Sequence, residues 1–208
     1  RSSDLYGYVF VNPSSGRLAC GDTGQGKLAG INAIVDVIEQ YCSGRKDLRG
    51  HSLLVTAGPT VESIDPVRYI TNRSSGRMGY AIARSGRNRG AEVTLISGPT
   101  NLETPANVKF IGVNSNSEMY EAAAAEFSGC DIAVMAAAPA DFKPSHVSAQ
   151  KIKKDDGNLE IVFERTRDIL YELGRLKGDR ILVGFAAESE RLVQNAKAKI
   201  QKKNLDLI

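Results

Sequence analysis

Residues 52–59 read Ser-Leu-Leu-Val-Thr-Ala-Gly-Pro, a short apolar run that ends in a glycine–proline pair. The pattern returns at residues 92–99, Glu-Val-Thr-Leu-Ile-Ser-Gly-Pro, and residues 131–136 form a third apolar run. Short apolar runs without alternation are typical of strands that are buried on both faces of a parallel sheet. We therefore expect parallel strands over 52–57, 92–97 and 131–136.

Helical patterns lie between these strands. Segment 76–89 has apolar residues at helical spacing and Gly90 as its stop, and segment 115–127 begins with a capping box of Ser115 and Glu118. The remaining expected elements are strands over 108–113, 159–164 and 181–185, helices over 167–177 and 190–203, and the start of a strand at 205–208. This alternation predicts an α/β fold, a Rossmann-like parallel sheet with helices on both faces.

The first fifty residues follow a different pattern. We expect a strand over 6–11, a glycine-rich stretch over 16–30 and an amphipathic helix over 31–42. The polar run at 43–47 is typical of a linker, so the chain divides into 1–50 and 51–208. Because the first residue is arginine and the last residues resemble a strand just begun, both ends are expected to lie inside a longer protein.

Composition excludes several classes of protein. The 208 residues are 42% hydrophobic and 25% charged, and no apolar run approaches the roughly 20 residues that cross a bilayer. A net charge of +3 does not indicate nucleic-acid binding. Three cysteines without metal-like spacing predict neither a disulfide framework nor a zinc site, and they fit a reducing cytoplasm. We expect a cytoplasmic protein that binds neither membranes nor nucleic acid.

The loop after the first strand carries candidate anion-binding groups. It ends in Ser74-Ser-Gly-Arg-Met-Gly79, where backbone N–H groups at a helix start and small glycines would let a phosphate approach. An ordinary capped helix start explains this spacing equally well. Arg68 suits bidentate contact with phosphate or carboxylate, and the amide of Asn72 can donate to a developing oxyanion. The alternative for both residues is a surface loop with solvated charges.

Later loops add cations and one carboxylate. Lys151-Ile-Lys-Lys154 could neutralise a triphosphate, although a solvated charge run is the alternative, as it is for Lys199 and Lys203. Asp141 follows small residues that would let a planar ligand lie close, and it can bind ribose, a base amino group or a metal, unless it is a turn or cap residue. Phe185 is either core or a stacking surface. These loops together describe a polyanion site without a protein nucleophile, which suits nucleotidyl or phosphoryl transfer.

The order of five motifs resembles a known family, the CTP-dependent phosphopantothenoylcysteine synthetase half of the bacterial bifunctional coenzyme A biosynthesis protein. The motifs are Thr56-Ala-Gly-Pro-Thr60 with Ile64 to Gly79, Ala136-Ala-Ala-Pro-Ala-Asp141, Lys151-Ile-Lys-Lys154, Gly184-Phe-Ala-Ala-Glu188 and Lys203-Asn-Leu-Asp-Leu-Ile208. The resemblance covers roughly residues 52–208. Residues 18–28 are similar to the end of the partner half, the flavin-dependent decarboxylase. The resemblance therefore implies a decarboxylase remnant plus linker over 1–50 and a C-terminally truncated synthetase domain over 51–208.

The resemblance implies a two-step ligation. The carboxylate of 4′-phosphopantothenate attacks CTP to give an acyl-cytidylate and pyrophosphate, with Mg²⁺ assisting. The amine of L-cysteine then displaces CMP and forms the amide. The family is dimeric, and its mobile lysine loop closes over the nucleotide, so a homodimer is expected.

The resemblance also implies roles for individual residues. Asn72 would bind and activate the acyl-cytidylate, and Lys151 would contact the triphosphate. The residues expected to hold CTP are Ala137, Ala138, Asp141, Lys151, Arg167, Asp168, Ile169, Leu170, Phe185, Lys199 and Lys203, with Arg167 at a position where the family commonly has proline. The phosphopantothenate end is expected at Gly58, Arg68, Asn72, Ser74, Ser75, Gly76 and Gly79, where charge and geometry add Arg68 and the helix start. No metal ligands are assigned.

Cys20 matches a decarboxylase cysteine that acts as a proton donor in the intact parent protein. FMN belongs only to the missing decarboxylase domain, so this chain is expected to bind no FMN and to have no decarboxylase activity.

Two alternatives remain. One is an NAD(P)-dependent oxidoreductase, disfavoured because some 16 residues separate the first strand from its helix and no acidic residue follows the strand that ends at Ser97. The other is an inactive fragment.

Overall fold

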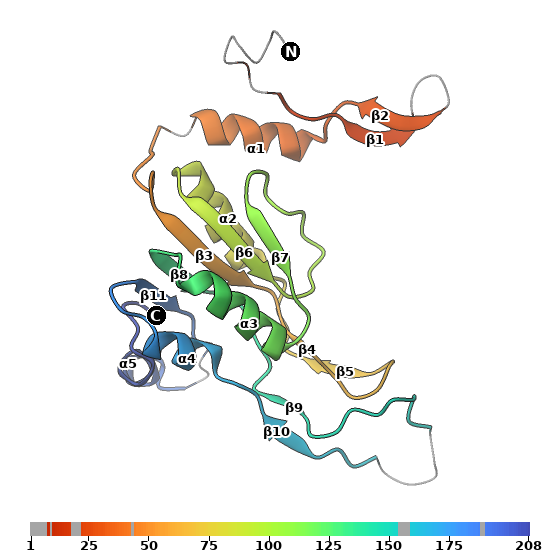
Figure 1. Cartoon of the computed structure of the whole chain (residues 1–208), viewed down its shortest axis with the longest axis vertical. Helices are drawn as coiled ribbons and strands as arrows, with labels where there is room; N and C mark the ends of the chain where they lie inside the picture. Colours follow the sequence, from red (N-terminus) through yellow and green to blue (C-terminus); the bar gives the residue numbers. More distant parts are fainter. Residues whose placement is uncertain (1–7, 9, 18–21, 43, 154–158, 188–189) are drawn as a thin grey trace.

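A five-stranded parallel sheet forms the centre of the protein (Figure 1). The computed structural model describes residues 8, 10–17, 22–42, 44–153, 159–187 and 190–208. The strands, in chain order, are β3 (Ser52–Ala57), β6 (Glu92–Ser97), β7 (Lys109–Gly112), β8 (Ile132–Met135) and β11 (Ile181–Gly184). Their order across the sheet is β11-β8-β3-β6-β7, and every neighbouring pair is parallel. The expected α/β fold is confirmed.

Successive strand residues point to opposite sides of the sheet, and both sets are apolar here. Helices therefore cover both faces. Helix α2 (Arg77–Asn88) packs Tyr80 and Ala83 onto the face that carries Leu53, Val55 and Leu95. The other face is covered by α3 (Asn116–Phe127), α4 (Ile169–Arg175) and α5 (Leu192–Lys203). Its core contains Leu54, Ile96, Met119, Phe127, Ala133, Leu173 and Leu182. Both faces of the central strands are therefore buried, as their continuous apolar sequences predict.

The helix ends follow the expected signals with one difference. The side chain of Ser115 accepts a hydrogen bond from the Glu118 N–H at 3.2 Å, as a capping residue does. The Glu118 carboxylate, however, accepts from the N–H of Asn114 at 2.8 Å and from the Ser115 hydroxyl at 3.2 Å, and no described bond joins it to the Ser115 N–H of a standard capping box. Gly90 has a φ of 95° and ends α2, which is the expected glycine stop.

Two short antiparallel hairpins extend from the carboxyl side of the sheet (Figure 1). One is β4 (Val61–Ser63) with β5 (Tyr69–Thr71), and the other is β9 (Phe142–Pro144) with β10 (Phe163–Arg165). The strand expected over 159–164 is misplaced, since residues 159–162 lie outside any strand and the paired residues are 163–165. The alternation of apolar residues at 159–164 suggested a strand, but the strand forms only at the residues that pair with β9.

The N-terminal region contains a hairpin and one helix. The hairpin is β1 (Ser14–Arg17) with β2 (Thr23–Lys27), and the expected helix is confirmed as α1 (Ile31–Cys42). The strand expected over 6–11 is wrong for the described residues 8, 10 and 11, which lie outside any strand; strand pairing occurs instead between β1 and β2. None of the described helices has the length and apolar character to cross a bilayer.

The chain ends beside the sheet, as expected for 205–208. Leu207 forms a single parallel bridge with Val183, and the Asp206 carboxylate accepts hydrogen bonds from the Leu182 N–H and the Lys177 ammonium. These contacts attach the segment after α5 to the edge strand β11.

Close approach of α4 and the end of α5 gives a first prediction. A Cβ atom added at Gly174 would lie 1.9 Å from the carbonyl oxygen of Lys203, which is backbone and has little freedom to move. We expect Gly174→Ala to lower the free energy of unfolding by about 1–3 kcal/mol in urea titrations. The matched control is Gly129→Ala, whose nearest neighbour atom would be 3.8 Å away. Equal stability of the two variants would contradict this packing.

Candidate functional site

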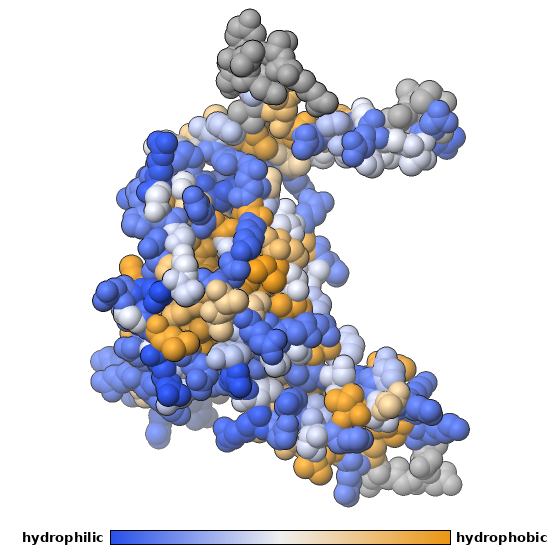
Figure 2. All heavy atoms as spheres, in the orientation of Figure 1, coloured by the Kyte–Doolittle hydropathy of each residue, from blue (hydrophilic) through white to orange (hydrophobic). Residues whose placement is uncertain are grey.

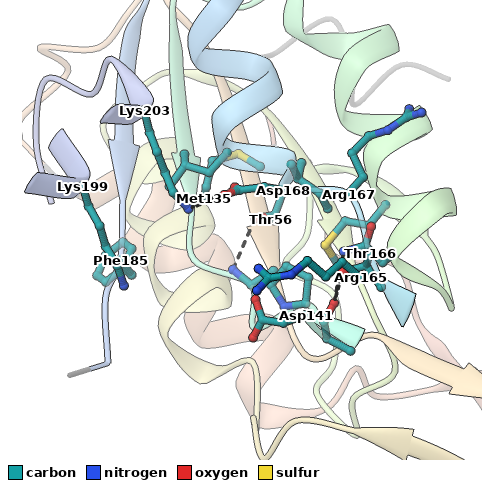
Figure 3. A pocket seen from close by; sticks show the side chains of 17 residues that line it. Thr56, Met135, Asp141, Arg165, Thr166, Arg167, Asp168, Phe185, Lys199 and Lys203 are labelled. Carbon is teal, nitrogen blue, oxygen red and sulfur yellow. Dashed lines mark hydrogen bonds and ion pairs between the residues drawn. The ribbon is translucent and has the colours of Figure 1, made fainter. Parts of the chain in front are cut away.

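A pocket of about 270 Å³ opens at the carboxyl end of the sheet, where the strand order reverses (Figure 3). From β3 the chain continues outward to β6 and β7, and it then returns to the other side of β3 as β8 and β11. In open α/β sheets such a reversal leaves a crevice in which ligands bind. The pocket is lined by the carboxyl ends of β3 and β8, by the loop after β8, by the start of α3, by the segment 165–170, by Phe185 after β11 and by two lysines of α5.

Buried threonines fix the loop that forms the floor of the pocket. The Thr56 hydroxyl accepts a hydrogen bond from the Ala137 N–H at 3.2 Å, and the Thr60 hydroxyl accepts from the Ala140 N–H at 2.9 Å. Between them the Gly58 carbonyl accepts from the Ala138 N–H at 2.9 Å. These bonds continue the parallel β3–β8 pairing beyond the last residues of both strands. We name residues 137–141 the alanine loop.

The opposite wall is fixed by electrostatic contacts. The Asp168 side chain caps α4 by accepting from the Tyr171 N–H, and it also forms an ion pair with Lys203 of α5 at 2.9 Å. The Arg167 guanidinium points away from the cavity and lies 4.2 Å from the centre of the Tyr120 ring on α3 (Figure 3). The Thr166 hydroxyl donates to the Ala140 carbonyl at 2.6 Å, which joins this wall to the alanine loop.

The structure brings most of the residues expected to hold CTP into this one pocket. Those that line it are Ala137, Asp141, Arg167, Asp168, Ile169, Leu170, Phe185, Lys199 and Lys203. Ala138 lies in the same loop without lining the cavity, and Lys151 lies outside it. The lining includes three cationic residues besides the outward-turned Arg167, namely Arg165, Lys199 and Lys203, and two acidic residues, Asp141 and Asp168. The pocket is therefore suited to a polyanion.

Sequence reasoning missed several residues of the lining. They are Thr56, Asn116, Met119, Met135, Pro139, Ala140, Arg165 and Thr166. Thr56 and Met135 lie near the carboxyl ends of two expected parallel strands, so the rule that ligands bind at these ends was a usable signal. Asn116 and Met119 come from the start of α3, and no local signal in the sequence places that helix at the pocket.

Asn72 lies at the margin of the alanine loop. Its side-chain N–H donates to the Pro139 carbonyl at 2.9 Å, although Asn72 itself is exposed and is not part of the pocket lining. An asparagine amide carries two N–H groups, so this bond leaves a second donor on the same nitrogen. The residue is thus oriented by the loop that forms the floor of the pocket.

The helix start expected to bind an anion packs closely against the end of β3. A Cβ atom at Gly79 would lie 2.5 Å from the Ala57 Cβ, and one at Gly76 would lie 3.3 Å from the Gly58 nitrogen. Gly76 is the N-cap of α2, has a φ of 73° and offers no side-chain acceptor to the first turn. Its own N–H donates to the Ser74 hydroxyl at 3.3 Å. Close packing against β3 and the residue after it explains why Gly76 and Gly79 are glycines. Ser75 has no described contact in this packing.

Arg68 and Lys151 lie together on the hairpin side of the pocket rather than in it. The Arg68 guanidinium donates to the Ile152 carbonyl at 2.8 Å. The buried Asp65 carboxylate accepts from the N–H groups of Val67, Arg68 and Ile152. These contacts attach the Lys151 segment to the β4–β5 hairpin. Arg68 therefore has a structural partner in the lysine segment.

The cysteines and candidate metal ligands add little to this site. Cys20 lies outside the described residues. Burial raises the pKa of the Cys130 thiol to about 11, which makes it unreactive at neutral pH, and Cys42 is exposed. In the described part of the chain, no three His, Cys, Asp or Glu residues are grouped as metal ligands.

This chain is similar in sequence to one known protein family over most of its length. Residues 48–208 match the DNA/pantothenate metabolism flavoprotein C-terminal domain family. The coenzyme A biosynthesis bifunctional protein CoaBC of Bacillus subtilis is 46% identical over 205 residues, covering 97% of this chain and 50% of that protein. The corresponding protein of Haemophilus influenzae is 44% identical over 203 residues, covering 97% and 51%. The chain thus spans about half the length of these curated relatives.

A solved structure shows the same fold. The crystal structure of the C-terminal domain of a CoaBC protein is 43% identical, with a TM-score of 0.70 and coverage of 78% of each chain.

The Asp65 contacts predict a pH-dependent contribution to stability. Burial alone would raise the pKa of this carboxyl, but N–H donors from three residues and the Arg68 guanidinium outweigh it and hold the pKa below its usual value of 3.8. A lowered folded-state pKa stabilises the protein above the unfolded-state pKa, and this stabilisation is lost as pH falls through the folded-state value. We expect Asp65→Asn to lower the free energy of unfolding at pH 7, with a difference from wild type that narrows in acid. Urea titrations from pH 7 to pH 2.5 measure this difference in the free energy of unfolding. The control is Asp179→Asn at an exposed position. A difference between wild type and Asp65→Asn that does not change with pH would contradict the prediction.

Proposed function

The chain belongs to the DNA/pantothenate metabolism flavoprotein C-terminal domain family, and from this premise we propose that it is a phosphopantothenate–cysteine ligase that uses CTP. The proposed substrates are 4′-phosphopantothenate, L-cysteine and CTP, and the products are 4′-phosphopantothenoylcysteine, CMP and pyrophosphate. The reaction belongs to coenzyme A biosynthesis, the role printed in the names of the CoaBC relatives.

One observation carries the proposal: the pocket at the strand reversal gathers the residues expected to hold CTP from four separate parts of the chain. They come from the alanine loop, the segment 167–170, Phe185 and helix α5. The pocket combines the small residues of the alanine loop, the exposed ring of Phe185 and the cations Arg165, Lys199 and Lys203, a set that suits a base and its triphosphate. The 270 Å³ volume lies just below the usual range of about 300–1,000 Å³ for ligand pockets, so the triphosphate would extend into the open mouth.

The first step requires positioning and charge neutralisation rather than a protein nucleophile. A carboxylate oxygen of 4′-phosphopantothenate bonds to the α-phosphorus of CTP, and the bond from that phosphorus to the bridging oxygen of pyrophosphate breaks. Negative charge grows on the departing pyrophosphate, which Lys199 and Lys203 are placed to stabilise. Mg²⁺ would enter with the nucleotide and neutralise its phosphates, and the exposed Asp141 is the pocket carboxylate available to it.

The second step uses Asn72. The amine of cysteine attacks the acyl carbon of the acyl-cytidylate, the carbonyl oxygen becomes an oxyanion, and CMP leaves as the amide forms and the amine loses its proton. One N–H of the Asn72 amide already donates to the Pro139 carbonyl, and the other is available for the acyl oxygen. The helix start at Ser74, Ser75 and Gly76, next to Gly58, is the proposed location of the phosphopantothenate phosphate.

Pyrophosphate release tests the proposal and the role of Lys151. Wild type should release pyrophosphate only when CTP and 4′-phosphopantothenate are both present, and CMP should follow when cysteine is added. Lys151 lies outside the pocket in this conformation, so its segment must close over the nucleotide to contribute. We expect Lys151→Gln to slow pyrophosphate release about 100-fold, because one charge on the leaving group is no longer neutralised.

The matched control is Lys109→Gln, an exposed lysine on β7 that pairs with Glu126. Its rate should stay within about twofold of wild type, the scatter expected for a surface substitution. Equal rates for the two variants would remove Lys151 from the reaction. Binding of NADPH with no effect of CTP would favour the oxidoreductase instead, and absence of all turnover would favour an inactive fragment.

We further propose that the chain forms a homodimer through its protruding hairpins. Large exposed hydrophobic side chains gather there. Orange atoms of apolar residues are visible in this region at the lower right of Figure 2. The exposed side chains are Val67, Tyr69, Phe142, Val147, Leu159, Val162 and Phe163, of which Val162 is 74% exposed. An apolar patch on an extended arm is typical of a protein–protein contact.

Sedimentation of the chain as a dimer would support this contact. We expect Val162→Asp to weaken dimerisation roughly tenfold or more, because an unpaired charge would be buried in the contact. The control is Leu176→Asp, an equally apolar exposed position that follows α4. Dissociation in both variants or in neither would contradict an interface at these hairpins.

A further inference from the structure

We propose that Thr60 is a positioning residue of this site, which fixes Asn72 and the alanine loop relative to each other. The inference rests on the proposed ligation reaction and assigns a role to a residue that touches neither substrate nor nucleotide. Thr60 is fully buried and is not part of the pocket lining. Any effect it has on the reaction must therefore pass through its neighbours.

Thr60 makes two hydrogen bonds to different segments. Its hydroxyl accepts from the Ala140 N–H at 2.9 Å, and its carbonyl accepts from the Thr71 hydroxyl at 2.7 Å. Ala140 belongs to the floor of the pocket, and Thr71 is the residue before Asn72. One buried residue thus connects the nucleotide pocket to the segment that carries the proposed oxyanion donor.

Asn72 closes these contacts into a ring. Its side-chain N–H donates to the carbonyl of Pro139, the neighbour of Ala140. The three bonds that join Thr60 to Ala140, Pro139 to Asn72, and Thr71 to Thr60 leave the Asn72 amide little freedom to rotate. If the Thr60 hydroxyl is lost, the Ala140 N–H has no acceptor, and the Pro139 carbonyl that orients Asn72 can shift.

The ring is also connected to the opposite wall of the pocket. The Ala140 carbonyl accepts from the Thr166 hydroxyl at 2.6 Å, two residues before Asp168. Thr56 makes a comparable bond to Ala137, but it lines the pocket directly and has no described bond to the β5 segment. Thr60 therefore fixes the position of the pocket floor, which would hold the nucleotide, relative to Asn72, which would contact the acyl group.

The experiment compares Thr60→Val, which keeps the shape and removes the hydroxyl, with Thr60→Ser, which keeps the hydroxyl. Thr94→Val, a half-buried strand position in β6 without a described side-chain bond, is the matched control. We expect Thr60→Val to lower kcat for amide formation about 10- to 100-fold, as misplacement of a reacting group does, with a smaller change in KM for CTP. Thr60→Ser should restore kcat to within about threefold of wild type, the scatter typical of a retained contact.

Thr71→Val provides a second route, because it breaks the ring at an exposed residue where folding is not at risk. It should lower kcat in the same direction as Thr60→Val, while the Thr94→Val control should not. Wild-type kcat in both Thr60→Val and Thr71→Val, measured below their unfolding temperatures, would overturn the proposal. If both variants lose thermal stability but keep the wild-type kcat, Thr60 has a structural role only, which would also overturn the proposal.

Amide hydrogen exchange at Ala140 makes the test independent of turnover. Exchange should be faster in Thr60→Val than in wild type and unchanged in Thr60→Ser, because only the first variant removes the acceptor. Unchanged exchange in Thr60→Val would overturn the positioning role even in an active enzyme. If wild type has the protected Ala140 amide but releases no pyrophosphate, the ligase assignment fails and the contact remains, so the two failures are distinguishable.

Discussion

The continued pairing of the chain beyond β3 and β8 is the constraint on which the site depends. At a strand reversal the two following loops run to opposite sides of the sheet and leave a crevice between them. Here the hydroxyls of Thr56 and Thr60 and the Gly58 carbonyl accept three N–H groups of the alanine loop. The floor of the crevice therefore has the rigidity of a sheet although it has no strand. A rigid floor is what a reaction that relies on positioning requires.

Electrostatic contacts complete the pocket without supplying a nucleophile. Lys203 pairs with Asp168, which also caps α4, so one carboxylate joins two helices at the wall. Arg167 is turned away onto Tyr120 and fixes the same segment against α3. Arg167 thus has a structural contact outside the cavity, whereas Lys203 both pairs with Asp168 and lines the pocket beside Lys199. This arrangement fits a site in which charge is stabilised on a leaving group rather than transferred to the protein.

The parts outside the central sheet share one property, which is exposed apolar surface. Helix α1 has no buried residue, and its Ile31, Val35, Ile38 and Tyr41 are exposed. The hairpins β4–β5 and β9–β10 expose a second apolar group on the opposite side of the sheet. Lys151 and Arg68 belong to this second region, where Asp65 connects the two hairpins through backbone N–H groups. The lysine segment and the proposed dimer contact are thus parts of one structural unit.

The sequence by itself determined the central sheet and its helices, because buried parallel strands need continuous apolar runs and helix ends need particular caps. About half of the pocket lining was also expected, but mainly from the resemblance to a family rather than from local patterns. Local patterns failed at the described residues 8, 10 and 11 and at 159–162, because a strand exists only where a partner is available and pairing is a long-range property. Only the tertiary structure decided that Asn116 and Arg165 reach the pocket while Lys151 and Arg68 do not. It alone also assigned Thr60, since a buried hydroxyl acquires its role from an amide eighty residues away.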